Sequence, residues 1–381
     1  MEKAKYLNQA LTTQLLCFEP MIPEVTPDPM AARRSPTARM RPPVMAHENG
    51  NMEFNLYAPK AETCVLVGTG GSFPGEYPMV KDELGYFRTV VSGITPGIHV
   101  HYYLVDGVKC SNSQAPYCYC AGEPMNFFDV PDPEEDFYLM KKVPHGDLRM
   151  EYFRSSYSGR IKTCWVYTPP GYDRSGKEYP VLYLQHGAGE DETGWIDMGK
   201  ANLILDNLLA DGRAEEMLIV MNYGFDTSGK KPEEGVSSQM IFAKELIEDC
   251  IPMIEDKYRV KTDRLNRAMA GLSMGSFQSV YNVLHHTDLF AYLGVIIGGF
   301  NLERAGKPEL IDDMPALNEK LRVVFCSNGE QEPACESNRA YMKMLGEKGL
   351  DNIFYSCPGY HELTVCRNSL VRFLPLLFRE V

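Results

Sequence analysis

The sequence of 381 residues contains 38 lysines and arginines against 51 aspartates and glutamates, which gives a formal net charge of −13 at pH 7. This acidic balance argues against a protein that binds nucleic acid irrespective of sequence, because such binding needs a basic surface. No apolar run approaches the roughly 20 residues of a membrane-spanning helix, and the first twenty residues lack the apolar stretch of a signal peptide. We therefore expect neither a nucleic-acid nor a membrane partner.

Eleven cysteines, an odd number, are scattered along the chain. This pattern favours reduced thiols over a disulfide framework and predicts a cytoplasmic protein. The one close pair, Cys118 and Cys120, lacks companions at zinc-ligand spacing. We expect no metal and no cofactor.

Residues 1–50 are predicted to be a proline-rich extension instead of a compact domain. Prolines interrupt any helix or central strand there, at Pro20, Pro23, Pro27, Pro29, Pro36, Pro42 and Pro43. The same segment carries a basic cluster of Arg33, Arg34, Arg39 and Arg41. The cluster suits a solvated extension, which is the simpler interpretation, or docking on an acidic surface of the same molecule or of a second subunit. A homo-oligomer is therefore left open.

Residues 51–131 are predicted to form a small β-sandwich. Segments 52–60 and 63–70 alternate in part between apolar and polar residues, the signature of half-buried strands, and Asp-Gly and Pro-Gly turn signals continue the series. Short strands spaced by turns, without helical periodicity, are typical of a sandwich. Residues 132–147 are then expected to be a linker.

Residues 148–381 are predicted to form a doubly wound α/β domain. Short apolar runs, several of them continuous, suit strands buried on both faces of a mainly parallel sheet; they include 179–185, 216–222, 267–273, 292–298 and 321–327. Helix-length stretches lie between these runs, and Pro252 should kink or divide the one at 242–258. The alternation of strands and helices indicates the α/β class.

The strongest local signal is the sequence Gly271-Leu272-Ser273-Met274-Gly275, which follows a predicted strand and precedes a predicted helix. A G-x-S-x-G sequence in that position predicts a nucleophile elbow with Ser273 as the nucleophile. Glycines flank the serine because the turn is too tight for side chains, and the N-terminus of the helix is aimed at the same place.

A nucleophilic serine needs a base, and in this kind of site the chain order is serine, acid, histidine. Only His285, His286 and His361 follow Ser273. The first two end the helix after the elbow, which leaves no room for an intervening acid, and we expect them to cap that helix or lie on its surface. His361 follows the last predicted strand, where a loop can reach back over Ser273, and is the predicted general base.

The acid should follow the predicted strand 321–327, which nominates Glu330 and Glu332. Its task is to accept the Nδ1 proton of the histidine and to stabilise the imidazolium. Either glutamate suits this task, and Asp351 lies too late in the chain. The residues alone leave the choice open.

The remaining catalytic part is an oxyanion hole. His186-Gly187-Ala188-Gly189 follows the predicted strand 179–185, as the H-G-G-G-type loop does in such hydrolases. We expect the N–H groups of Gly187 and Ala188, together with that of Met274, to stabilise the developing oxyanion. His186 is interpreted as a residue that stabilises the loop.

Several separated motifs resemble the feruloyl-esterase-like esterases, the group of carbohydrate esterase family 1 and the enterochelin esterases. The motifs are WVYTPPGYD, YPVLYLQHGAGEDETGW, IPMIEDKYRV, DRLNRAMAGLSMG and GYHELTVCRNSLVRFLPLLF. They cover roughly residues 145–381 in the family's order, which implies an α/β-hydrolase fold. Residues 51–131 are similar to the Ig-like domain, related to carbohydrate-binding family 48, that often precedes such esterases.

The resemblance implies a serine esterase acting on hydroxycinnamoyl esters, feruloyl or p-coumaroyl, of plant saccharides. Ser273 matches the family's nucleophile and His361 its base. Counting back from Glu336-Ser337-Asn338 places Glu332 where the family has its acid, commonly an aspartate. The expected partner is a small ester or a feruloylated oligosaccharide, and the aromatic residues that could line its slot are Trp195, Tyr223, Phe225, Phe300 and Tyr360.

Two other functions remain in view. One is hydrolysis of another ester, such as a siderophore trilactone. The other is carbohydrate binding by a protein whose esterase domain is inactive, which only the unusual acid segment favours. The segment 51–131 has no tryptophan, since the chain's two are Trp165 and Trp195. Packing on the catalytic domain, or shaping its cleft, is therefore the preferred interpretation of that segment.

Overall fold

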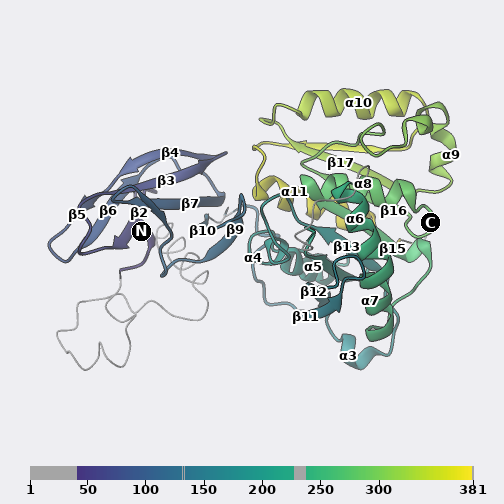
Figure 1. Cartoon of the computed structure of the whole chain (residues 1–381), viewed down its shortest axis with the longest axis horizontal. Coiled ribbons are helices and arrows are strands. Elements are labelled where there is room, and N and C mark those ends of the chain that lie inside the picture. Colours follow the sequence, from purple (N-terminus) through teal and green to yellow (C-terminus); the bar gives the residue numbers. More distant parts are fainter. Residues whose placement is uncertain (1–40, 131, 133, 227–236, 380–381) are drawn as a thin grey trace. The chain divides into compact units, whose positions relative to one another are not determined.

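The computed structural model describes residues 41–130, 132, 134–226 and 237–379. The chain divides into two compact units, residues 1–136 and 137–381 (Figure 1). Residues 1–40, most of the predicted extension, lie outside the described residues. Among the residues described, no helix combines the length and the hydrophobicity needed to cross a membrane.

The N-terminal unit consists of two antiparallel sheets. One sheet has the order β1-β2-β6-β5, and the other has the order β4-β3-β7-β10-β9 with β8 paired to β7. The strands are β1 (Val44–Ala46), β2 (Met52–Tyr57), β3 (Cys64–Gly70), β4 (Phe73–Pro78), β5 (Val80–Lys81), β6 (Tyr86–Val91), β7 (Gly97–Val105), β8 (Val108–Cys110), β9 (Tyr117–Cys120) and β10 (Glu123–Val130).

The two sheets share one apolar core. Phe54 of β2 contacts Phe73 of β4 and Phe128 of β10, with ring centroids 5.8 and 5.2 Å apart, so aromatic side chains join the sheets. The first strand, β1, pairs with β2 although it falls within the segment predicted to be an extension. The sequence did not predict this strand, because the apolar triplet Val44–Ala46 is short and directly follows two prolines.

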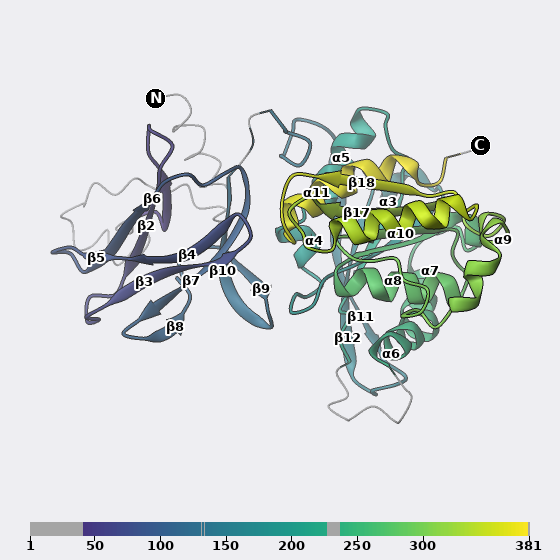
Figure 2. The same cartoon turned by 90° about the horizontal axis from the view of Figure 1, so that it is seen from above.

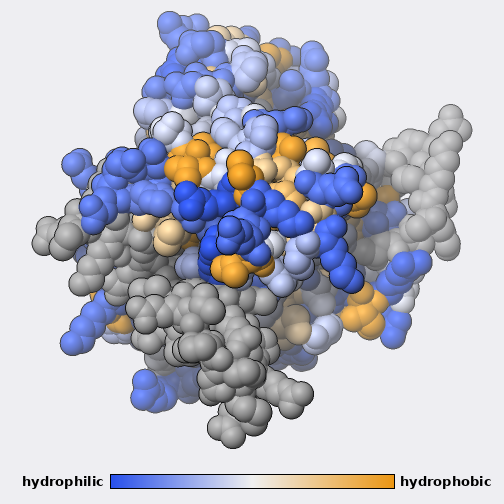
Figure 3. Space-filling view, turned by 90° about the vertical axis from the view of Figure 1, so that its left-hand side faces the viewer, coloured by the Kyte–Doolittle hydropathy of each residue, from blue (hydrophilic) through white to orange (hydrophobic). Residues whose placement is uncertain are grey.

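On the face of the molecule drawn in Figure 3, hydrophobic residues occur in small groups among hydrophilic ones. Exposed apolar side chains of the N-terminal unit include Val80, Leu84 and Val90. Scattered exposed apolar residues are ordinary for a protein surface and do not by themselves mark an interface.

The second unit is built on an eight-stranded sheet of order β11-β12-β14-β13-β15-β16-β17-β18. The strands are β11 (Asp147–Arg154), β12 (Ile161–Thr168), β13 (Val181–Gln185), β14 (Leu218–Asn222), β15 (Arg267–Leu272), β16 (Tyr292–Ile296), β17 (Val323–Gly329) and β18 (Ile353–Cys357). Neighbouring strands from β14 to β18 are parallel. Strand β12 pairs antiparallel with both of its neighbours, β11 and β14. The predicted α/β class is confirmed.

Helices cover both faces of this sheet (Figures 1 and 2). The longer helices are α5 (Ala201–Ala210), α6 (Ser238–Glu245), α7 (Ile251–Lys257), α8 (Met274–His285), α10 (Cys335–Glu347) and α11 (Leu363–Phe373). Helices α6, α7, α8 and α10 share a core with one face of the sheet, and α11 packs beside α5 and on β16, β17 and β18. Shorter helices are α3 (Tyr172–Ser175), α4 (Gly194–Asp197) and α9 (Met314–Asn318).

Pro252 divides the predicted helix at 242–258. A π-helical turn, Leu246–Cys250, lies between α6 and α7, and Pro252 is the second residue of α7, where it has no N–H to donate to a carbonyl of the preceding turn.

The segment expected as a linker, 132–147, belongs in its second half to the α/β unit. The side-chain amide of Asn207 donates to the carbonyls of Phe137 and Leu139, at 2.8 and 2.9 Å. Nδ1 of His145 lies 2.8 Å from the buried carboxylate of Asp206. The composition of this segment, which is rich in charged residues, did not predict these hydrogen bonds.

Candidate active site

Ser273 stands at a strained turn between β15 and α8. Its φ of 51° and ψ of −111° lie outside the regions that a non-glycine residue usually occupies. A Cβ on Gly271 would lie 2.4 Å from the backbone of Gly275, and a Cβ on Gly275 would lie 2.6 Å from the carbonyl oxygens of Gln185 and His186. The flanking glycines therefore allow the turn, and the Ser273 N–H anchors it by donating to the carbonyl of Ile296 at 3.0 Å.

His361 lies in the loop between β18 and α11, where the sequence predicted a base. Its Nδ1 lies 2.5 Å from Oε1 of Glu332. The imidazole side chain is 52% exposed, whereas the glutamate side chain is 5% exposed. The pair thus joins a buried carboxylate to a ring that solvent and substrate can reach.

Glu332 lies in the turn directly after β17. Its Oε2 accepts hydrogen bonds from the side-chain amide of Asn328 at 2.9 Å and from the N–H of Gly329 at 2.8 Å. Burial alone would raise the pKa of this carboxyl. The hydrogen bonds from His361, Asn328 and Gly329 outweigh burial, so the pKa lies below its ordinary value and the group stays ionised.

The two glutamates between which the sequence left the choice open differ in their contacts. Glu330 is exposed, and its backbone N–H donates to the carbonyl of Cys357. Asp351 is also exposed and precedes β18. Of these three carboxylates, Glu332 is the one that accepts from His361.

Gln331, which sequence reasoning missed, ties the two loops together. Its backbone N–H donates to the carbonyl of Gly359 at 3.0 Å, and its side-chain oxygen accepts the N–H of Gly359. A Cβ on Gly329 would lie 2.3 Å from the carbonyl oxygen of Gly359. The loop that carries His361 is therefore held against the turn that carries Glu332.

Ser273, Glu332 and His361 line one pocket of about 460 Å³. Such a volume is within the range of sites that hold a small organic ligand. Phe277, Arg304 and Tyr341 line the same pocket. The structure thus brings the three predicted catalytic side chains to one cavity.

One N–H group of the predicted oxyanion loop, that of Gly187, already donates a hydrogen bond within the protein. The N–H of Gly187 donates to Oε2 of Glu190 at 2.9 Å, which corrects the expectation that this group is free for an oxyanion. In the described part of the chain, the N–H groups of Ala188 and Met274 have no acceptor. Burial raises the pKa of Glu190 to about 7, against the opposing effects of the Gly187 hydrogen bond and of His361.

His186 stabilises this loop, as predicted from its position. It is 1% exposed, its Nδ1 lies 2.8 Å from the carbonyl oxygen of Gly187, and its Nε2 accepts the N–H of Gly224 at 2.9 Å. Burial lowers its pKa to about 4, so the ring is neutral and can accept.

The five predicted substrate-contacting aromatics do not form one slot. Trp195 is 1% exposed and donates its indole N–H to the carbonyl of Gln185, so it belongs to the core. Tyr223 and Phe225 pack around His186, with centroids 5.9 and 5.5 Å from its ring. Phe300 lines the pocket but is only 2% exposed, and exposed Tyr360 is absent from the pocket lining.

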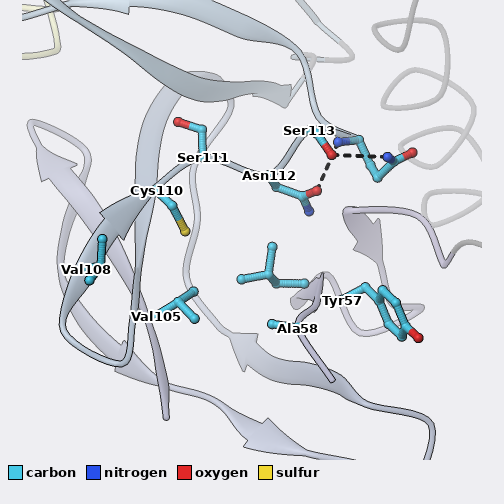
Figure 4. A pocket seen from close by; sticks show the side chains of 10 residues that line it. Tyr57, Ala58, Val105, Val108, Cys110, Ser111, Asn112 and Ser113 are labelled. Atoms are coloured by element: carbon cyan, nitrogen blue, oxygen red, sulfur yellow. Dashed lines mark hydrogen bonds between the residues drawn. The ribbon is translucent and has the colours of Figure 1, made fainter. Parts of the chain in front are cut away.

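A separate pocket of about 430 Å³ lies in the N-terminal unit (Figure 4). Val105 and Val108 form part of its wall. The polar groups of Asn112 are committed to the framework: Nδ2 donates to the carbonyl of Asn55 at 2.9 Å, and Oδ1 accepts the N–H of Gln114 at 3.0 Å. This pocket has no nucleophile–base pair among its lining residues.

The elbow, the ionised carboxylate and the exposed imidazole are arranged as the serine, acid and base are in proteins of the α/β-hydrolase class. Residues 155–343 match the sequence model of the Esterase family. That stretch lies within the α/β unit, residues 137–381, and includes Ser273 and Glu332, so this unit is similar in sequence to that family.

Two known proteins are similar to this chain, one in sequence and one in structure. The chain is 33% identical over 345 residues to an endo-1,4-beta-xylanase/feruloyl esterase of Xylanibacter ruminicola, a match that covers 88% of this chain and 46% of that protein. The chain thus spans less than half the length of this relative. A CE1 ferulic acid esterase of Anaeromyces mucronatus has a TM-score of 0.54 and 26% identity, over 64% of this chain and 96% of that one.

A third similarity extends over both units. The enterobactin esterase of Shigella flexneri has a TM-score of 0.59 and 14% identity, over 85% of this chain and 92% of that one. At this identity the likeness concerns the fold. The predicted α/β-hydrolase fold is confirmed.

Proposed function

We propose that this protein is a serine esterase that hydrolyses carboxylic esters through an acyl-enzyme. The observation that carries the proposal is the presence of Ser273, at its strained elbow, in one pocket with the hydrogen-bonded pair His361 and Glu332. A strained serine, an exposed imidazole and a buried carboxylate are the parts that acyl transfer to serine requires.

In the first half-reaction, Nε2 of His361 takes the proton from Oγ of Ser273 while Oγ bonds to the ester carbonyl carbon. The N–H groups of Ala188 and Met274 stabilise the negative oxygen that results. His361 then gives its proton to the departing alkoxide, the carbon–oxygen bond of the ester breaks, and Ser273 carries the acyl group. Glu332 stabilises the imidazolium in both transition states.

In the second half-reaction, water replaces the alcohol. His361 takes a proton from water, whose oxygen bonds to the acyl carbon, and the bond from that carbon to Ser273 Oγ breaks as Oγ regains the proton. The products are a carboxylic acid and the free enzyme. The scheme uses no cofactor.

We propose hydroxycinnamoyl esters of plant saccharides, feruloyl or p-coumaroyl, as the substrates. The names of two relatives include feruloyl or ferulic acid esterase. The pocket volume of about 460 Å³ suits an acyl group of that size. Esters of another kind, such as a siderophore trilactone, are the alternative within the same mechanism.

We further propose a cellular location and a domain type for the N-terminal unit. We propose a cytoplasmic protein, because none of the ten cysteines in the described part of the chain is assigned to a disulfide. We also propose that the N-terminal unit is the Ig-like domain suggested by its sequence, on the basis of its two antiparallel sheets around one core.

Hydrolysis of methyl ferulate and of p-nitrophenyl acetate, by the protein and by its Ser273→Ala variant, tests the proposal. Release of ferulate that vanishes in Ser273→Ala would support both mechanism and substrate class. Cleavage of the acetate alone would keep the mechanism and replace the substrate. Failure to cleave either ester would favour a carbohydrate-binding protein with an inactive esterase domain.

A further inference from the structure

The pocket that contains Ser273 also contains a charge for which the proposed reaction has no use. Arg304 is the only lysine or arginine among the residues that line it. The acid and the base of the proposed triad, Glu332 and His361, lie in the same lining and are paired with each other. In a chain of net charge −13, a cation at this place calls for an explanation.

The turn that carries Arg304 is firmly held. The backbone N–H of Arg304 donates to Oδ1 of Asn301 at 2.7 Å, and the N–H of Lys307 donates to the carbonyl of Leu302 at 2.8 Å. Nε2 of His285, at the end of α8, lies 2.8 Å from the carbonyl oxygen of Ala305. Because Leu302 and Ala305 are buried, the position of the turn is fixed relative to α8.

The guanidinium itself rests on an aromatic ring of the site. The Cζ of Arg304 lies 3.4 Å from the centroid of Phe277, whose N–H donates to the carbonyl of Ser273 at 3.4 Å. A guanidinium stacked on a ring keeps its N–H donors at its edge, in the plane of the group. The charge is therefore placed one helical turn from the nucleophile, with its donors available.

Other arginines of this unit show what a structural role looks like. Arg267 is 4% exposed and pairs with Glu255 at 2.5 Å. Arg339 pairs with Glu336 at 3.3 Å. Within the described part of the chain, no carboxylate lies at ion-pair distance from Arg304, which is exposed. Its guanidinium thus has donors that the protein leaves unused.

We propose that Arg304 is a specificity-determining residue that binds a carboxylate carried by the ester substrate, so that anionic esters are preferred over their neutral analogues. The inference rests on the proposed esterase function and names the class of substrate within it. A guanidinium matches a carboxylate with two parallel N–H···O bonds, which makes an acidic saccharide or an acidic acyl group the expected partner.

The test compares two pairs of esters of matched size. In the first pair, p-nitrophenyl butyrate and mono-p-nitrophenyl succinate, the carboxylate lies on the acyl side. In the second, ethyl ferulate and carboxymethyl ferulate, it lies on the alcohol side. For each pair, the ratio of kcat/KM for the anionic ester to that for the neutral ester is measured for the wild type, Arg304→Gln and Arg304→Lys.

We expect the ratio for one pair to fall roughly five- to tenfold in Arg304→Gln and less in Arg304→Lys, which keeps the charge but loses the planar fork. In the wild type, the ratio should also fall as salt rises from about 0.1 M to about 1 M, because the Debye length shortens from about 10 Å to about 3 Å. The pair that responds identifies the side of the substrate that Arg304 contacts.

Arg322→Gln is the matched control. Arg322 is exposed and directly precedes β17, at the opposite end of that strand from Asn328 and Gly329. The substitution removes the same charge from the protein and should leave both ratios unchanged. Neutral esters cleaved with ratios that Arg304→Gln does not alter would overturn the charge inference alone. Absence of turnover with all four esters would instead overturn the proposed esterase function.

Discussion

Nδ1 of His361 lies 2.5 Å from Oε1 of Glu332, a carboxylate that the chain buries and surrounds with two further donors. Glutamate reaches farther than aspartate, and the turn after β17 accommodates this length. The N–H of Glu332 donates to the carbonyl of Gly329 at 3.0 Å, so the residue folds back onto the end of its own strand. The acid is thereby fixed before substrate arrives.

This relationship predicts a large and selective effect of removing the acid. Glu332→Ala should lower kcat for p-nitrophenyl acetate by about 10²–10⁴, because His361 loses the group that orients it and stabilises its charged form. Glu330→Ala, which removes an exposed neighbouring carboxylate, should change kcat less than twofold in steady-state assays. A sharp loss in Glu330→Ala with little effect of Glu332→Ala would contradict the assignment.

Gln331 should behave as a positioning residue. Gln331→Ala removes the acceptor of the Gly359 N–H and loosens the loop of His361, so kcat should fall roughly ten- to a hundredfold while KM changes little. Gln331→Glu retains an acceptor oxygen and should restore much of kcat. A uniform loss in both variants, accompanied by a lower melting temperature, would show that the residue supports the fold and not the geometry of the site.

The glycine after the nucleophile leaves no room for a methyl group. Gly275→Ala should lower the free energy of unfolding by more than about 2 kcal/mol and abolish activity, because the new Cβ meets the carbonyls of Gln185 and His186 at 2.6 Å. Gly346→Ala in α10 is the control, since its Cβ meets only the side-chain amide of Asn352 at 3.3 Å. Urea unfolding should show a change within about 1 kcal/mol there.

Glu190 predicts a pH dependence of stability. Its pKa of about 7 in the folded chain lies above its ordinary value of 4.5, so the folded state binds more protons than the unfolded state between those two values. The free energy of unfolding therefore falls as pH rises from about 4.5 to about 7. Relative to wild type, Glu190→Gln should gain stability across this window and keep the gain above it.

Denaturant unfolding of both proteins from pH 4 to pH 8 measures this difference. The amide oxygen introduced by Glu190→Gln can still accept the Gly187 N–H, so the comparison isolates the charge. A difference in stability that is constant across the whole range would show that Glu190 does not titrate there.

The sequence predicted the parts of the site that local chemistry dictates. The elbow at Ser273 could be predicted because two glycines flank the serine between a predicted strand and a predicted helix. The closeness of Gly275 to the Gln185 carbonyl explains why a glycine is needed there. His361 was found because of its place after the last strand. The choice between Glu330 and Glu332 depended on how a turn folds back, which residue types alone do not encode.

Side-chain direction in loops was the main source of wrong expectations. Trp195 lies in a loop-flanked segment near the motifs, yet its indole turns into the core and donates to the Gln185 carbonyl. Conversely, no pattern in the sequence indicated a role for Glu190 or Arg304. Their roles depend on contacts with Gly187 and Phe277 that only the folded chain brings about.

The most direct test of the account is acylation of Ser273. Rapid mixing with p-nitrophenyl acetate should give a burst of p-nitrophenolate equal to the enzyme concentration, and acid quenching followed by peptide mass spectrometry should place an acetyl group on Ser273. In Ser273→Ala the burst and the adduct should both be absent. An acetyl group found on another residue, or steady turnover that persists in Ser273→Ala, would contradict the proposed mechanism.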